Sequence, residues 1–125
     1  MKLKEYLLNE ATTLVGFTKK EVGLMESHFK SERWDTAELE SPDTFYATNG
    51  NTYDEDSWTN IIINIYKERY RKTGETVYRA VRTDESKGSD DEFADEYPAG
   101  DWMSKPFGGA ESIAELKKLL RKITE

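Results

Sequence analysis

Apolar residues in the first third of the chain recur every three or four positions, which is the spacing of one face of a helix. The two series are Leu3, Leu7, Ala11 and Leu14, and then Val22, Met25 and Phe29. Gly16 is suited to end the first helix, and a capping box formed by Thr18 and Glu21 is suited to begin the second. The short connection between the two series predicts an antiparallel helix pair.

The next segment combines signals for a loop and for strands. Residues 34–43 are acidic and include Pro42, which favours a loop. Asn49-Gly50 then lies between residues that favour strands, and this dipeptide is a strong short-range signal for a hairpin turn. We therefore expect a loop over 34–43 and a hairpin over 45–53.

Residues 58–70 are compatible with two structures. Their apolar positions follow helical spacing, but Thr59 and four isoleucines favour a strand. Residues 76–83 form a clearer strand, and Thr73-Gly74-Glu75 would supply a turn between the two segments. We predict a long β-hairpin here and keep a helix over 58–70 as the alternative.

The last third is predicted to hold a loop and a helix. Acidic residues, serine, glycine and proline over 84–101 predict a long acidic loop that is flexible in part. Ser112 and Glu115 form a second capping box, which opens a helix. Its inward residues are Ile113, Leu116, Leu119, Leu120 and Ile123.

The predicted fold class is therefore α+β. It combines an N-terminal antiparallel helix pair, an antiparallel sheet of three to four strands, and a C-terminal amphipathic helix packed on one sheet face. The chain of 125 residues has the length of one domain, so we expect residues 1–125 to form a single domain.

Composition excludes several classes of protein. The chain has no cysteine, so disulfides, thiolate metal sites and cysteine nucleophiles are excluded. Glu5, Asn9 and Glu10 interrupt the first apolar stretch, which argues against a signal peptide. The apolar run Ile61-Ile62-Ile63 is too short to span a bilayer. The expected location is therefore the cytoplasm.

Charge is sorted along the chain, whose formal net charge is −7. Residues 32–56 hold eight acidic residues against Arg33 alone, and residues 84–101 hold eight against Lys87 alone. The stretch between them is basic and carries tyrosines. A surface divided in this way is suited to charged partners.

We therefore predict a small acidic interaction protein, an inhibitor or modulator that docks carboxylate-rich loops onto a basic surface of a nucleic-acid-handling protein. Small phage and mobile-element proteins with anti-defence roles have this size and charge, a likeness of class that depends on no motif. Trp102 beside Asp101 would be an aromatic anchor. The predicted partner-binding residues are Asp54, Glu55, Asp56, Asp84, Glu85, Asp90, Asp91, Glu92, Asp95, Glu96 and Trp102.

Imitation of nucleic acid sets a stricter requirement on these acids. An extended tract of 18 residues would span about 60 Å, a length over which duplex DNA carries roughly 35 phosphates. A single tract is several-fold too dilute to match that charge. Mimicry therefore requires the two tracts to share one face of the molecule.

The alternative function is a nucleic-acid-binding module that uses the basic hairpin at 66–82. Two tyrosines on one strand face could stack bases. Direct binding of nucleic acid is disfavoured because the whole chain is acidic. The residues of this alternative site are Lys67, Arg69, Arg71, Lys72, Arg79, Arg82, Tyr66 and Tyr70.

Catalytic and metal-binding motifs are absent from the sequence. It contains no nucleophile elbow, zinc-binding histidine pair or phosphate-binding glycine loop. His28 is the sole histidine and is expected at the surface or at its boundary. We therefore expect a protein that is not an enzyme, with no metal and no cofactor. No membrane partner is expected, and the sequence leaves the oligomeric state open.

Overall fold

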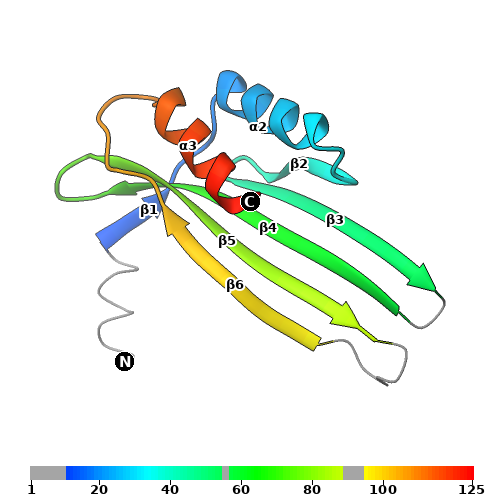
Figure 1. Ribbon diagram of the computed structural model, residues 1–125. Coiled ribbons are helices and arrows are strands. Elements are labelled where there is room, and N and C mark those ends of the chain that lie inside the picture. The colour runs from blue at the N-terminus through cyan, green and yellow to red at the C-terminus, as the bar shows by residue number, and fades with distance from the viewer. Residues whose placement is uncertain (1–10, 55–56, 89–94) are drawn as a thin grey trace.

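A computed structural model describes residues 11–54, 57–88 and 95–125. In this part of the chain, two helices lie on one face of a six-stranded antiparallel sheet (Figure 1). The strand order is β2-β3-β4-β5-β6, and β1 also pairs with β4. The elements are β1 Thr12–Leu14, α2 Lys19–Ser31, β2 Thr36–Ser41, β3 Thr44–Asp54, β4 Ser57–Tyr70, β5 Thr76–Lys87, β6 Asp95–Met103 and α3 Ile113–Ile123. The fold class is α+β, as predicted.

The predicted N-terminal helix pair is wrong. Residues 12–14, the end of the first predicted helix, form β1, in which Thr12 pairs with Tyr70 and Leu14 with Glu68. Thr12 and Thr13 are β-branched, and strands accommodate such side chains better than helices do. In the described chain, α2 is therefore the single helix that precedes the sheet strands β2 to β6. Residues 1–10, the rest of that predicted helix, lie outside the described residues.

Helix α2 begins as the sequence predicts. The Glu21 backbone N–H donates to Thr18 Oγ1 at 3.2 Å, and the Thr18 N–H donates to Glu21 Oε1 at 2.7 Å. This reciprocal pair satisfies two backbone donors that the helix leaves free. The helix then buries Met25 and Phe29 against the sheet.

The predicted sheet of three to four strands is too small, and the loop over 34–43 is a further error. Residues 36–41 form β2, whose turn to β3 lies at Pro42-Asp43. Asn49-Gly50 lies inside β3, where Gly50 pairs with Asn60. The long isoleucine-rich β4 pairs with β3 from Tyr66 to Ser57, along the whole length of β3, and this ladder overrides the local turn preference of Asn-Gly.

Strand β4 resolves the ambiguity over 58–70 in favour of a strand. It pairs with β5 from Arg69 opposite Thr76 to Trp58 opposite Lys87, which confirms the long hairpin. The predicted loop over 84–101 is wrong where it overlaps strands, because β5 continues to Lys87 and β6 begins at Asp95. Residues 89–94 lie outside the described residues.

The core lies between the sheet and the two helices. Alternate residues of β3, β4 and β5 face the helices, and α3 covers them with its apolar side as predicted. Phe29 stacks on Phe45 with ring centroids 5.9 Å apart. The core cluster comprises Met25, Phe29, Phe45, Ala47, Ile63, Ile65, Tyr78, Ala80, Leu116, Leu119, Leu120 and Ile123.

The capping box predicted at Ser112 and Glu115 does not form. The Ser112 side chain makes no capping hydrogen bond. Its backbone N–H instead donates to the Tyr78 hydroxyl at 3.1 Å. The contact to the sheet therefore replaces the local cap at the start of α3.

Two surfaces remain outside this core. Strands β3 to β6 extend beyond the helices toward one end of the sheet (Figure 1). The sheet side that faces away from the helices, which we call the open face, carries the other alternate residues, including Trp58, Ile62 and Tyr66.

Candidate functional site

The strand register brings the last part of the first acidic tract and the first part of the second to the same end of the sheet, whereas the acids in β2 lie away from it. Asp54 pairs with Ser57 at the ends of β3 and β4, and Ser86 pairs with Asp95 at the ends of β5 and β6. Trp58 of β4 pairs with Lys87 of β5, so the two hairpins lie side by side. We call this region, where β3 and β5 end and β4 and β6 begin, the acidic end (Figure 1).

The structure describes the side chains of two predicted partner-binding acids in this region, Asp84 and Glu85. Asp84 is partly exposed and accepts a 3.0 Å hydrogen bond from Arg82 Nε. Glu85, on the open face, lies 3.5 Å from the Asn60 side-chain amide. Asp54, Asp95 and Glu96 belong to strands that border this end. Glu55, Asp56, Asp90, Asp91 and Glu92 lie outside the described residues.

Trp102, the predicted aromatic anchor, is not brought to the acidic end. It pairs with Ala80 near the middle of the sheet and packs against the core. Seven residues separate it from the start of β6, which corresponds to about 20 Å along a strand. Trp102 instead borders a pocket of about 650 Å³ together with Arg82, Ala99, Lys122 and Glu125.

Trp58 is an aromatic residue at this end that the sequence analysis did not assign to the site. It lies opposite Thr52 and Lys87 on the open face, and it is not part of the core cluster. Strand parity was the signal that could have identified it, because Trp58 alternates out of phase with Ile63 and Ile65.

Two arginines of the basic hairpin pair with acids of the second tract. Arg79 makes a two-pronged contact with Asp101, in which Nη2 lies 2.6 Å from Oδ2. This hydrogen bond raises the pKa of the Arg79 guanidinium. Arg82 binds Asp84 and also donates to the Ile123 carbonyl oxygen at 2.7 Å, at the end of α3. Both guanidinium groups therefore serve contacts within the molecule.

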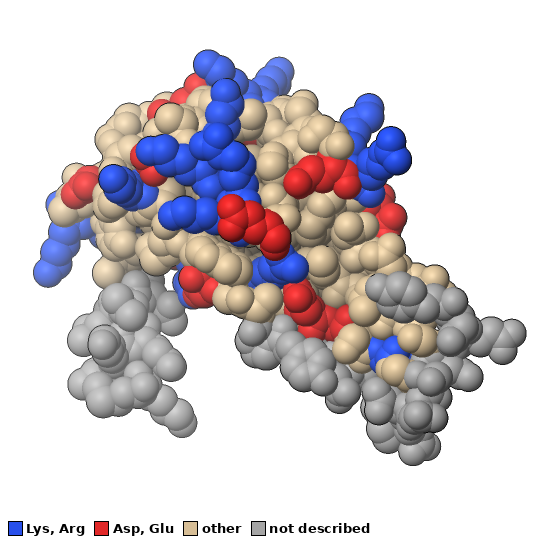
Figure 2. Space-filling model, viewed as in Figure 1, with Lys and Arg blue, Asp and Glu red and all other residues tan. Residues whose placement is uncertain are grey.

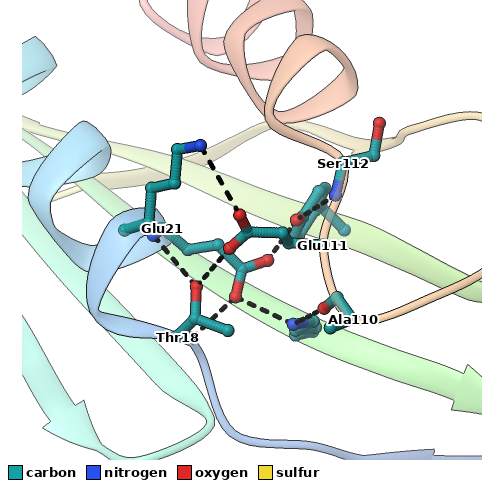
Figure 3. A network of polar contacts seen from close by, with 8 residues as sticks. Thr18, Glu21, Ala110, Glu111 and Ser112 are labelled. Carbon is teal, nitrogen blue, oxygen red and sulfur yellow. Dashed lines mark hydrogen bonds and ion pairs between the residues drawn. The ribbon is translucent and has the colours of Figure 1, made fainter.

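Lys67, another residue of the predicted nucleic-acid site, is buried. Its Nζ lies 2.8 Å from Glu21 Oε1 and donates to the Ala110 carbonyl oxygen. Tyr78 donates its hydroxyl proton to the other Glu21 oxygen. Figure 3 shows Glu21 at the start of α2 and Ala110 in the segment before α3, with the sheet behind them. The network is internal, and it fastens both helices to the sheet.

The remaining basic residues lie at the opposite end from the acids. Arg69 ends the β4 ladder with β5, and Arg71 and Lys72 follow in the turn, where all three are exposed. Tyr66 and Tyr70 occupy the open face, on the other side of β4 from Lys67 and Arg69, as the strand parity predicts. Burial raises the pKa of Tyr66.

The described residues also bear on metal binding and on the surroundings of His28. They contain no group of three or more potential metal ligands. His28 is half-buried, with Nε2 3.1 Å from Thr124 Oγ1 and 3.1 Å from Glu32 Oε2. Neither helix in the part of the chain that is described combines the length and apolar character needed to cross a bilayer.

Comparison with known proteins identifies no relative of this chain. No family model, no curated protein and no solved structure matches this chain.

Proposed function

We propose that this chain is a small, non-enzymatic interaction protein that docks its acidic end onto a basic surface of a nucleic-acid-handling protein. It acts there as an inhibitor or modulator, in the manner of phage or mobile-element proteins that block host defence. Carboxylates pair with lysine and arginine of the partner and compete with nucleic acid for the same surface. Charge accelerates encounter, and apolar contact prolongs residence.

The observation that carries the proposal is the convergence of two hairpins, each of which bears acids. Ten of the predicted acids belong to these strand ends and to the connections between them. The ends of four neighbouring strands span about 15 Å, a length over which duplex DNA carries roughly nine charges. Together, the acids of the two tracts can therefore approach the charge density of duplex DNA, which a single extended tract cannot.

Affinity capture from native cells tests the proposal. Immobilised full-length protein is expected to retain a nucleic-acid-binding protein at about 50 mM salt and to release it at about 500 mM, since salt screens exposed charges. The triple variant Asp90→Asn/Asp91→Asn/Glu92→Gln should lose this partner. Binding is then measured with the purified partner, and duplex DNA or RNA should compete.

A matched control removes three negative charges elsewhere. Glu26, Glu38 and Glu40 are exposed on α2 and β2, and their replacement by glutamine should leave capture unchanged. Equal retention by both triple variants would contradict the proposal. Salt-dependent binding of labelled DNA or RNA that is lost in Arg69→Glu/Arg71→Glu would instead establish the nucleic-acid-binding alternative.

A further inference from the structure

A groove between the two helices has a surface chemistry that the proposed function does not use. Near the starts of α2 and α3, Thr18 Oγ1 donates to Glu111 Oε2 at 2.7 Å. At their ends, His28 Nε2 lies 3.1 Å from Thr124 Oγ1. The helices therefore run side by side in the same direction, with a groove of about 340 Å³ between them. It is lined by Leu24, Ser27, His28, Lys117, Leu120 and Arg121.

The floor of this groove is apolar and its rim is cationic. Leu24 of α2 and Leu120 of α3 form the floor, and Ser27 beside them is small and exposed, so a partner side chain can reach the leucines. The volume lies near the lower limit of small-molecule pockets, which hold about 300–1,000 Å³. The groove therefore suits one or two side chains of a partner better than a cofactor.

The rim cations are available to a partner. Lys117 and Arg121 are exposed, and neither makes an ion pair within the described residues. Helices α2 and α3 together carry seven lysine and arginine residues against three glutamates, of which Glu21 is buried against Lys67. Figure 2 shows lysine and arginine side chains gathered over the helical layer. This layer is therefore a cationic surface on an acidic protein.

We propose that this groove binds an acidic amphipathic helix of a partner protein. Such a helix packs its apolar face into a groove with anchor residues three or four positions apart. Two of its carboxylates, four residues apart, have the same axial spacing of about 6 Å as Lys117 and Arg121. An apolar side chain between them covers Leu24 and Leu120. A nucleic-acid backbone offers phosphates but no apolar side chain for this floor, so it fits the groove less well.

The net charge of −7 opposes an acidic partner only at long range. In about 0.15 M salt, exposed charges more than about 8 Å apart are largely screened. The rim cations therefore dominate at the groove, while the acidic end lies where the strands extend beyond the helices (Figure 1). Because exposed ion pairs are individually weak, the apolar contact must contribute as well. The affinity is modest and falls as salt rises.

Fluorescence anisotropy with a labelled peptide tests the proposal. The acidic probe is a helix of about 20 residues, long enough to form in water, with leucines every three or four positions along one face and glutamates four apart beside them. One control probe has glutamine in place of glutamate, and the other has serine in place of leucine. The full chain should bind the acidic probe saturably in about 0.15 M salt, and each control probe about tenfold more weakly or less.

Two groove variants locate the binding. Lys117→Glu/Arg121→Glu reverses both rim cations and should weaken binding of the acidic probe about tenfold or more. Ser27→Glu places a repelling carboxylate at an exposed position of the lining and should also weaken it. The control Arg71→Glu/Lys72→Glu makes the same charge change as the double groove variant, but at the β4–β5 turn, and should bind like the wild type.

Several results would overturn the proposal. They are a wild type that does not bind the acidic probe, groove variants that bind it normally, and a serine probe that binds as tightly as the leucine probe. Duplex DNA or anionic lipid vesicles that bind the wild type but not Lys117→Glu/Arg121→Glu would reassign the surface to phosphate. The groove variants leave the acidic end unchanged, so their capture of a basic partner tests the proposed function separately.

Discussion

Lys67 shows how strongly the role of one charged residue depends on the strand face that it occupies. From the sequence, it belonged to a basic surface for nucleic acid. Lys67 alternates in phase with Ile63 and Ile65, however, and the whole set faces the helices. Strand parity places Lys67 on the same face of β4 as these isoleucines. The sequence did not reveal which face of the sheet the helices cover, because the predicted N-terminal helix pair is wrong.

Replacement of Lys67 by methionine should destabilise the protein by about 3–5 kcal/mol, because it leaves the buried Glu21 carboxylate without its cation. The double variant Glu21→Gln/Lys67→Met removes both charges and should lose less stability than the sum of the single variants. Urea denaturation of the four proteins measures the cycle. Additive effects of the two substitutions would show that the ion pair is not coupled.

Because of Tyr78, the stability of the protein should fall as pH rises in the alkaline range. Burial, followed by its hydrogen bond to Glu21, raises the pKa of Tyr78 above its ordinary value of 10.0. Its neutral form is therefore favoured in the folded state. Above about pH 10 the unfolded chain releases this proton while the folded chain keeps it, so the free energy of unfolding falls as pH rises.

Denaturation at a series of pH values from 8 to 11 measures this loss. The slope due to Tyr78 is at most about 1.4 kcal/mol per pH unit. The control Tyr78→Phe should lose that part of the slope, although its stability at pH 8 is lower. An unchanged slope in Tyr78→Phe would assign the pH dependence to other groups.

At the scale of elements, errors arose wherever tertiary pairing competes with local preference. Asn49-Gly50 has the sequence of a tight turn, yet it continues β3 because β4 offers a partner along its whole length. The Gly50 N–H donates to Asp35 Oδ2 at 2.8 Å. Because Gly50 has no side chain, Asp35, the residue that precedes β2, can approach its backbone closely. By contrast, the capping box predicted at the start of α2 forms, because Thr18 and Glu21 bond to each other, whereas at the start of α3 the Ser112 N–H donates to Tyr78 of the sheet instead.

Gly100 in β6 has a specific structural requirement. Its φ is +148°, and a Cβ at this position would lie 2.6 Å from Cη2 of the Trp102 ring. Gly100→Ala should therefore displace the indole and destabilise the protein by about 1–3 kcal/mol in urea denaturation. Gly108→Ala is the control, because no atom lies within 4 Å of its Cβ position, and it should change stability by less than about 0.5 kcal/mol. Equal stability of the two variants would contradict the argument.

At the scale of the whole molecule, the order of charge along the chain follows the path of the sheet. Consecutive strands β3 to β6 are neighbours, so every second connection lies at the same end. The end of the first acidic tract and the start of the second are separated by two strands and lie at one end of the sheet, while the basic turn at Arg71 and Lys72 lies at the other. The sequence revealed the alternation of charge, but the number of strands between the tracts had to be known before their meeting could be predicted.

The polar network around Lys67 can be completed only late in the synthesis of the chain. Glu21 arrives early from the ribosome, but Ala110 and Ser112, which complete its surroundings, arrive after the last strand. Leu116 and Ile123 follow later still, and they close the core over Phe45 and Ile65. The nascent chain therefore exposes an apolar sheet until its final helix emerges, and chaperones have the whole of that interval in which to bind it.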